Sequence, residues 1–121
     1  MAITLKQVLD LLSPDELDYD AAAKLGPEAL PHLETIIKEK GPLLASKAAY
    51  LAGLIQDRRS VDVLKIAAQS TYPEVRVQAA ATTSNLHFKE AEEVLELLSK
   101  DEDEGVRMRA LRSKELRSSN P

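Results

Sequence analysis

Histidine is the first residue type to consider, because its side chain can act as a base or as a metal ligand near neutral pH. The chain holds two, His32 and His87. Ser84 and Glu90 stand close to His87, but a serine, a histidine and an acid form a catalytic triad only when the fold aligns their side chains. Residues of one turn do not have that geometry by default, so we predict no catalytic residue. His32 takes the place of a valine in later copies of a repeat described below, which favours a packing role between adjacent repeats.

Metal, cofactor and phosphate sites lack their usual sequence patterns. The sequence has no cysteine, and its two histidines do not have the spacing of a zinc-binding helix. The four glycines never cluster, so no phosphate-binding loop is indicated. We therefore expect no metal site and no cofactor.

Composition argues against several other classes of protein. Of the 121 residues, 44% are hydrophobic and 30% are charged, which suits one domain with a continuous core. The net charge of −4 does not favour duplex DNA as a partner. The start, MAITLKQVLDLL, lacks the basic region of a secretory signal, and the longest apolar stretch, residues 43–55, is too short and too polar to cross a bilayer. We expect a cytoplasmic protein, in keeping with the absence of cysteine.

The second half of the chain aligns with itself when it is shifted by thirty-one residues. The shift aligns one column of small residues and two apolar columns, which are Ala48, Ala79 and Ala110, then Leu44, Val75 and Val106, then Leu33, Leu64 and Leu95. Small residues recur where two helices must approach closely, and Gly53 marks another such position. We expect the three leucines to form one internal row of the core.

Helix-forming residues dominate the chain and only 3% of it is aromatic, so an all-α fold is predicted. Capping boxes indicate helix starts at Thr4–Gln7, Ser13–Glu16 and Thr71–Glu74. Helices are expected near residues 5–12, 14–25, 28–39, 42–56, 60–70, 73–86, 89–100 and 104–117. Each repeat then consists of a helix A, a short turn and a helix B. One domain is predicted, with N-terminal helices or a cap over 1–25, helix pairs over 26–102, a terminal half repeat over 103–117 and a tail over 118–121.

Two segments resemble a known repeat type. The run AAYLAGLIQD at 48–57, followed by SVDVL at 60–64, and the run DEDEGVRMRA at 101–110 look like the short bacterial HEAT-like repeat that also occurs in phycobilin lyase subunits. The resemblance covers about residues 26 to 113. It implies a right-handed α-solenoid of antiparallel helix pairs, of the armadillo and HEAT type, stabilised by stacking of one pair on the next. Such repeats occur in scaffolds, lyase accessories and regulators, so they indicate fold better than function.

The same resemblance implies a ladder between adjacent repeats, in which an arginine follows an acidic residue by six positions. Asp101 and Arg107 fit this spacing. Arg76 keeps the arginine, but Ser70 stands where its acid would be, so Arg76 is expected to reach across to Asp101. Structural roles are predicted for these charged residues, because a guanidinium is well shaped to bridge adjacent loops.

The helices B provide the candidate binding surface. In HEAT-like solenoids they line the concave side, and here their polar positions line up across the repeats. We predict a groove that is acidic along one ridge and mixed along the other, and that binds another protein or a peptide. The residues expected to contact this partner are Glu34, Lys38, Asp62, Lys65, Gln69, Glu93, Glu96 and Lys100. The other interpretation is that the acidic runs over 90–96 and 101–104 are a solvated face and a favourable helix start.

The C-terminal segment is basic and its repeat is incomplete. Residues 89–104 carry two positive and eight negative charges, whereas five basic side chains follow, at Arg107, Arg109, Arg112, Lys114 and Arg117. The last repeat stops after its helix A, so Val106, Ala110 and Leu111 lack the helix B that would cover them. A monomer with a capped end is favoured over an end-to-end dimer.

Three functions follow from these patterns. The leading one is a non-catalytic protein-interaction module or scaffold. The alternative is an accessory protein of the phycobilin lyase type, which takes part in chromophore attachment or removal. Nucleic-acid binding through the basic C-terminal helix is disfavoured, because the predicted groove is acidic and the chain has no tryptophan. A fragment or a designed array would also have few repeats, but irregular columns such as residues 82–85 favour a natural protein.

Overall fold

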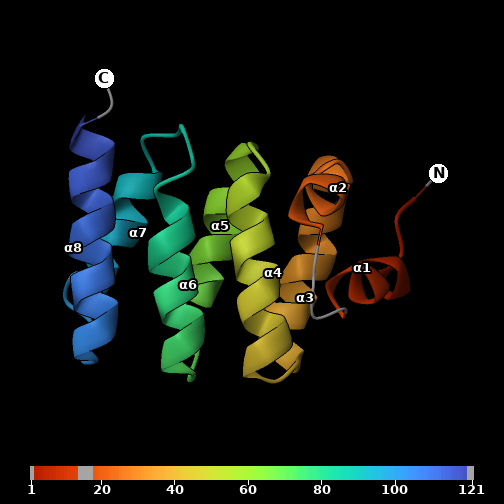
Figure 1. Ribbon diagram of the computed structural model, residues 1–121, viewed down its shortest axis with the longest axis horizontal. Coiled ribbons are helices and arrows are strands. Elements are labelled where there is room, and N and C mark those ends of the chain that lie inside the picture. Colours follow the sequence, from red (N-terminus) through yellow and green to blue (C-terminus); the bar gives the residue numbers. More distant parts are fainter. Residues whose placement is uncertain (1, 14–17, 120–121) are drawn as a thin grey trace.

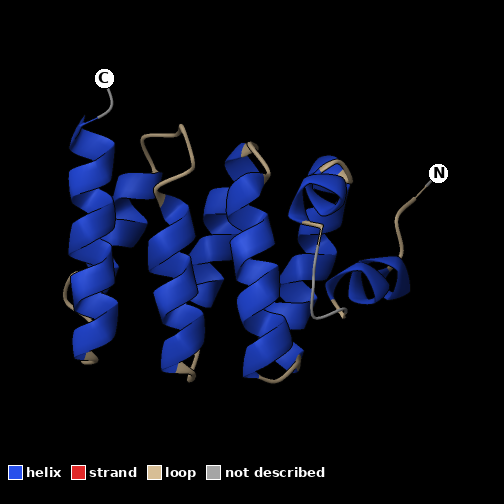
Figure 2. Ribbon diagram, viewed as in Figure 1, coloured by secondary structure: helices blue, strands red, loops and turns tan. Residues whose placement is uncertain are grey.

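The computed structural model describes residues 2–13 and 18–119. Every regular element in these ranges is a helix, so the all-α prediction is confirmed (Figure 2). None of the described helices is long and apolar enough to span a membrane. In chain order they are α1 (Leu5–Leu12), α2 (Tyr19–Ala23), the 3₁₀ helix η1 (Gly26–Ala29), α3 (Leu30–Glu39), α4 (Pro42–Leu54), α5 (Arg58–Ala67), α6 (Pro73–Thr83), α7 (Ala91–Leu98) and α8 (Glu104–Ser119).

The helices stand in two layers (Figure 1). The front layer consists of α2, α4, α6 and α8, side by side, and the back layer consists of α3, α5 and α7, while α1 lies at the N-terminal end. Each helix from α4 to α8 packs on its neighbours in both layers. This is the α-solenoid predicted from the repeat, with α4, α6 and α8 as helices A and α3, α5 and α7 as helices B.

The predicted row of leucines lies in the core, where Leu33 and Leu64 are fully buried and Leu95 is 1% exposed. Close packing of α4 on α6 depends on Gly53, because a Cβ atom added there would stand 2.6 Å from the Cβ atom of Thr82. No side chain fits at residue 53 unless one of the two helices moves. The packing role predicted for Gly53 is therefore confirmed.

Helix ends differ from the predicted ones at several places. The capping box at Thr4 and Gln7 is present, but α6 begins at Pro73 with Tyr72 as its cap residue, so the box predicted at Thr71 was wrong. The ring of Pro73 disfavours helical backbone at Tyr72, which has φ −92° and ψ 117°. The predicted box at 13–16 and the helix start at residue 14 involve residues outside the described ranges.

Candidate protein-binding surfaces

Arg76 ties α6 to the segment that leads into α8. Its Nε and Nη2 atoms donate to the two carboxylate oxygens of Asp101 at 2.9 and 3.2 Å, and its Nη1 atom donates to the carbonyl oxygen of Ser70 at 2.9 Å. Both side chains of the ion pair are only 10% exposed. Burial opposes ionisation of Asp101, but hydrogen bonds from Arg76 and from the amide of Asp103 outweigh it and lower the pKa of Asp101.

Arg107 occupies the same position one repeat later. Its Nη1 atom donates to the carbonyl oxygens of Asp101 at 2.8 Å and of Glu102 at 3.0 Å. Arg76 bonds in the same way to the carbonyl of the residue six positions before it. The carboxylate of Asp101 therefore pairs with Arg76, whereas Arg107 contacts the backbone carbonyl of Asp101.

The outer surface of the back layer holds the eight residues predicted to contact a partner, and all eight are exposed or half-buried. The helices α5 and α7 end earlier than predicted, at Ala67 and Leu98. Gln69 and Lys100 therefore lie in the turns that follow these helices. The other six lie on helices and are Glu34 and Lys38 on α3, Asp62 and Lys65 on α5, and Glu93 and Glu96 on α7.

Lysines pair with several acidic side chains of this surface. The repeat pattern aligned the acids of successive helices but could not show which lysines would reach them. Glu96 accepts a hydrogen bond from Lys114 on α8 at 2.7 Å, and this bond lowers the pKa of Glu96. The remaining ion pairs join Glu34 to Lys38 at 3.7 Å, Glu93 to Lys65 at 3.4 Å and Glu96 to Lys100 at 3.5 Å.

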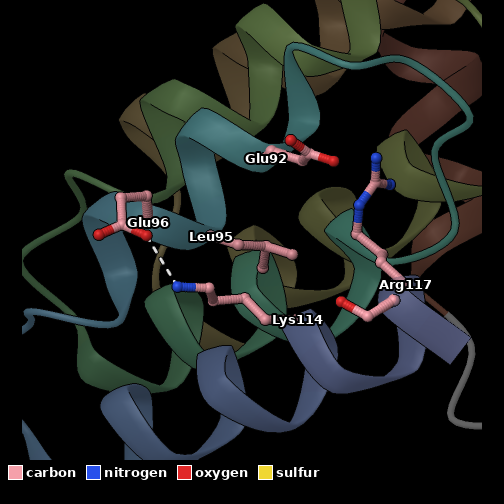
Figure 3. A pocket seen from close by; sticks show the side chains of 6 residues that line it. Glu92, Leu95, Glu96, Lys114 and Arg117 are labelled. Carbon is pink, nitrogen blue, oxygen red and sulfur yellow. Dashed lines mark hydrogen bonds and ion pairs between the residues drawn. The ribbon is translucent and has the colours of Figure 1, made fainter.

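Two shallow depressions open near these residues. The first lies where α3 and α5 end, and it combines the apolar side chains of Ile66 and Tyr72 with the polar side chains of Lys38 and Gln69. The second lies between α7 and α8, and its lining residues are Glu92, Leu95, Glu96, Lys114, Arg117 and Ser118 (Figure 3). Figure 3 shows Lys114 reaching Glu96 across this depression. The first depression therefore offers more apolar contact to a partner.

The loop between α6 and α7, residues 84–90, is held by both of its neighbours in the stack. Arg117 on α8 donates to the carbonyl oxygens of Leu86 and Phe88. On the other side, Gln56 donates to the carbonyl oxygen of Asn85 and accepts from the amide of His87. These bonds hold the loop in place, and no motif in the sequence predicts them.

The two histidines lie apart in different settings. The Nε2 atom of His32 is 2.6 Å from the carbonyl oxygen of Ile3, so His32 joins α3 to the N-terminal segment and not to an adjacent repeat as expected. Beside His87, the Ser84 hydroxyl donates to the carbonyl of Ala81 and Glu90 pairs with Arg58, so neither forms a triad with it. In the described ranges, no group of three acidic or histidine side chains could hold a metal ion.

The outer face of α8 was predicted only in part from the sequence. Val106 and Ala110 are fully buried, so the expectation that they lack cover was wrong: α6 and α7 enclose them. Leu111 is 49% exposed and Met108 is 62% exposed. The sequence signal for this exposed face is the column that holds alanine at residues 49 and 80 and leucine at 111.

Stacked helix pairs joined by a buried arginine place the chain in a structural class, the two-layer α-solenoids of HEAT-like repeats. Models of known protein families give no match, and neither do curated proteins. Among solved structures, the chain is similar to one from the complex of CpcE and CpcF of phycocyanin lyase from Nostoc sp. PCC7120, with a TM-score of 0.74 and 24% identity. The match covers 97% of this chain and 79% of that one. The fold predicted from the HEAT-like resemblance is confirmed.

Proposed function

We propose that the chain is a protein-binding accessory subunit of the phycobilin lyase type, which assists the attachment or removal of a bilin without supplying the catalytic groups. The likeness to a phycocyanin lyase complex, with a TM-score of 0.74 over 97% of the chain, carries this proposal. That neighbour was solved as a complex of two proteins, which supports a partner protein here as well. Because one fold can host several functions, the bilin needs a test of its own.

Absorbance spectroscopy with phycocyanobilin provides this test. The purified chain is mixed with the bilin, first alone and then together with an apo-phycocyanin subunit. We expect the visible band to change position and shape in at least one mixture, because a linear tetrapyrrole held by a protein changes conformation. The urea-unfolded chain is the matched control. Spectra equal to the control in both mixtures would exclude a role in bilin handling.

A general scaffold is the second candidate, and the depression at the ends of α3 and α5 favours it. This depression places Ile66 and Tyr72 beside Lys38 and Gln69, a mixture of apolar and polar groups that suits a peptide. Affinity capture with the double variant Lys38→Glu and Gln69→Glu tests this surface. Leu43→Glu, at a 69% exposed residue of the front layer, is the control. The scaffold proposal requires that the back-layer variant lose captured proteins that the control retains.

A further inference from the structure

The outer face of α8, at the C-terminal end of the described stack, is only partly polar, whereas most repeat proteins close with a polar outer face. Three large apolar side chains of α8 are exposed, those of Met108, Leu111 and Leu116. On α6, the residue aligned with Leu111 is Ala80, which is fully buried, and the residue aligned with Met108 is Val77, which is half-buried against the core. The positions that α6 uses to pack inside the stack therefore stay open on α8.

Arg107 repeats half of the contacts that Arg76 makes. In Arg76, Nη1 binds a carbonyl while Nε and Nη2 bind the carboxylate of Asp101. In the described part of the chain, Arg107 makes its hydrogen bonds through Nη1 alone. The side of the guanidinium that holds a carboxylate in Arg76 is thus left for an acidic group beyond α8.

The net charge of α8 indicates what kind of protein surface can bind it. Residues 104–119 carry five basic and two acidic side chains, a net charge of +3. Two copies of α8 facing each other would therefore repel, whereas an acidic surface of another protein would be attracted.

We propose that α8 is a docking surface on which a second HEAT-like subunit continues the solenoid. The first helix of that subunit lies along Met108 and Leu111, and a carboxylate just before this helix binds Arg107. The contact between α8 and α6 is the template, since Asp101 precedes α8 by three residues and binds Arg76. This inference rests on the protein-binding part of the proposed function and is independent of the bilin.

Site-specific photocrosslinking in the native cells tests the inference. The full chain carries p-benzoylphenylalanine in place of Leu111, and the control chain carries it in place of Leu97, which is 53% exposed on α7. We expect an adduct from position 111 that is absent from position 97. Its crosslinked peptide must come from a helical-repeat protein and lie next to an aspartate or glutamate at a helix start.

Charge exchange then tests the role of Arg107. Arg107→Glu should lower the adduct yield about tenfold, because it turns an attraction across the interface into a repulsion, and replacing the partner's acidic residue by arginine should restore the yield. Should Arg107→Glu fail to fold by circular dichroism, Met108→Glu replaces it, because residue 108 is 62% exposed. No adduct at 111, an adduct with a second copy or with a protein of another fold, or a yield indifferent to these variants would overturn the inference. A bilin shift without an adduct contradicts the docking alone, and an adduct without a bilin shift contradicts the bilin role alone.

Discussion

Arg76 shows how one residue can compensate for a gap in a repeat. Ser70 stands where the ladder would have an acid, and its carbonyl accepts a hydrogen bond from Arg76 while Asp101 of the next repeat supplies the carboxylate. The pair is 10% exposed on both sides, so the loss of either partner leaves the other desolvated without its counter-charge. Stability at this point therefore depends on a residue twenty-five positions away in the sequence.

Asp101→Asn should lower the free energy of unfolding by about 2 kcal/mol near neutral pH, the worth of a hydrogen bond to a charged group. The pKa of Asp101 is lowered in the folded state, so its contribution is complete above the unfolded value of about 4 and is lost as pH falls through the lower folded value. Urea unfolding of the original protein and of Asp101→Asn, from pH 7 down to pH 2, measures this contribution. The difference between them should shrink in acid.

Asp10→Asn is the control for this measurement, because Asp10 pairs with Lys6 on the surface of α1 and its side chain is 65% exposed. We expect it to change stability by less than about 1 kcal/mol. A difference between Asp101→Asn and the original chain that stays constant with pH would contradict the ion pair.

Gly53→Ala should destabilise the protein by about 1–3 kcal/mol, because the added methyl group would overlap Thr82 and force α4 away from α6. Thermal unfolding followed by circular dichroism measures the effect. Gly41→Ala is the matched control, since a Cβ atom added there meets nothing within 4 Å. Equal melting temperatures for the two variants would show that α4 and α6 adapt easily.

At the scale of elements, the sequence predicts which helices exist better than it predicts where they end. The thirty-one-residue shift identifies the core column because buried positions depend on the spacing within each helix. Helix ends depend on single cap residues instead, and α5 starts at Arg58 because the Asp57 side chain accepts from the amide of Arg59. Ion pairs between helices, such as Lys65 with Glu93, also depend on how the two helices are rotated relative to each other. An alignment of repeats carries no information on this rotation.

The contact of α8 with the loop at 84–90 gives a prediction for these elements. Arg117→Ala removes the donors to the carbonyl oxygens of Leu86 and Phe88, so amide hydrogen exchange in the loop should become faster while α4 stays protected. Mass spectrometry of exchanged peptides measures both. Arg112→Ala is the control, because this side chain is 62% exposed and pairs with Glu115 of the same helix. Faster exchange in both variants would contradict the role of Arg117.

For the molecule as a whole, a stack of helix pairs shares its stability between neighbours, so the position of a residue along the stack matters. The central Leu64 lies on α5, between the helices of two other repeats, whereas Leu95 lies on α7 near the open end (Figure 1). The sequence aligns the two as equivalent. Their surroundings differ, because α5 packs on a back-layer helix at each side, α3 and α7, whereas α7 packs on a back-layer helix at one side, α5.

Leu64→Ala and Leu95→Ala should therefore unfold differently. Each substitution leaves a cavity that should lower the free energy of unfolding by about 2–5 kcal/mol. Leu64→Ala should speed hydrogen exchange throughout the stack, whereas Leu95→Ala should speed it in α7 and α8 and leave α3 and α4 protected. Peptide-resolved exchange measures the two patterns, with the unchanged chain as reference. Identical patterns would mean that the chain unfolds as one cooperative unit.

Leu111 has one more consequence for whatever lies beyond α8. Inside the stack this column holds Ala49 and Ala80, both fully buried, and such small residues let neighbouring front-layer helices come close. In the docking that we propose, Leu111 keeps the next helix farther away, so the step between the two subunits is wider than the step between two repeats of one chain. The acidic residue that meets Arg107 must span this greater width. Glutamate, longer by one methylene group, fits the junction better than the aspartate that serves inside the chain.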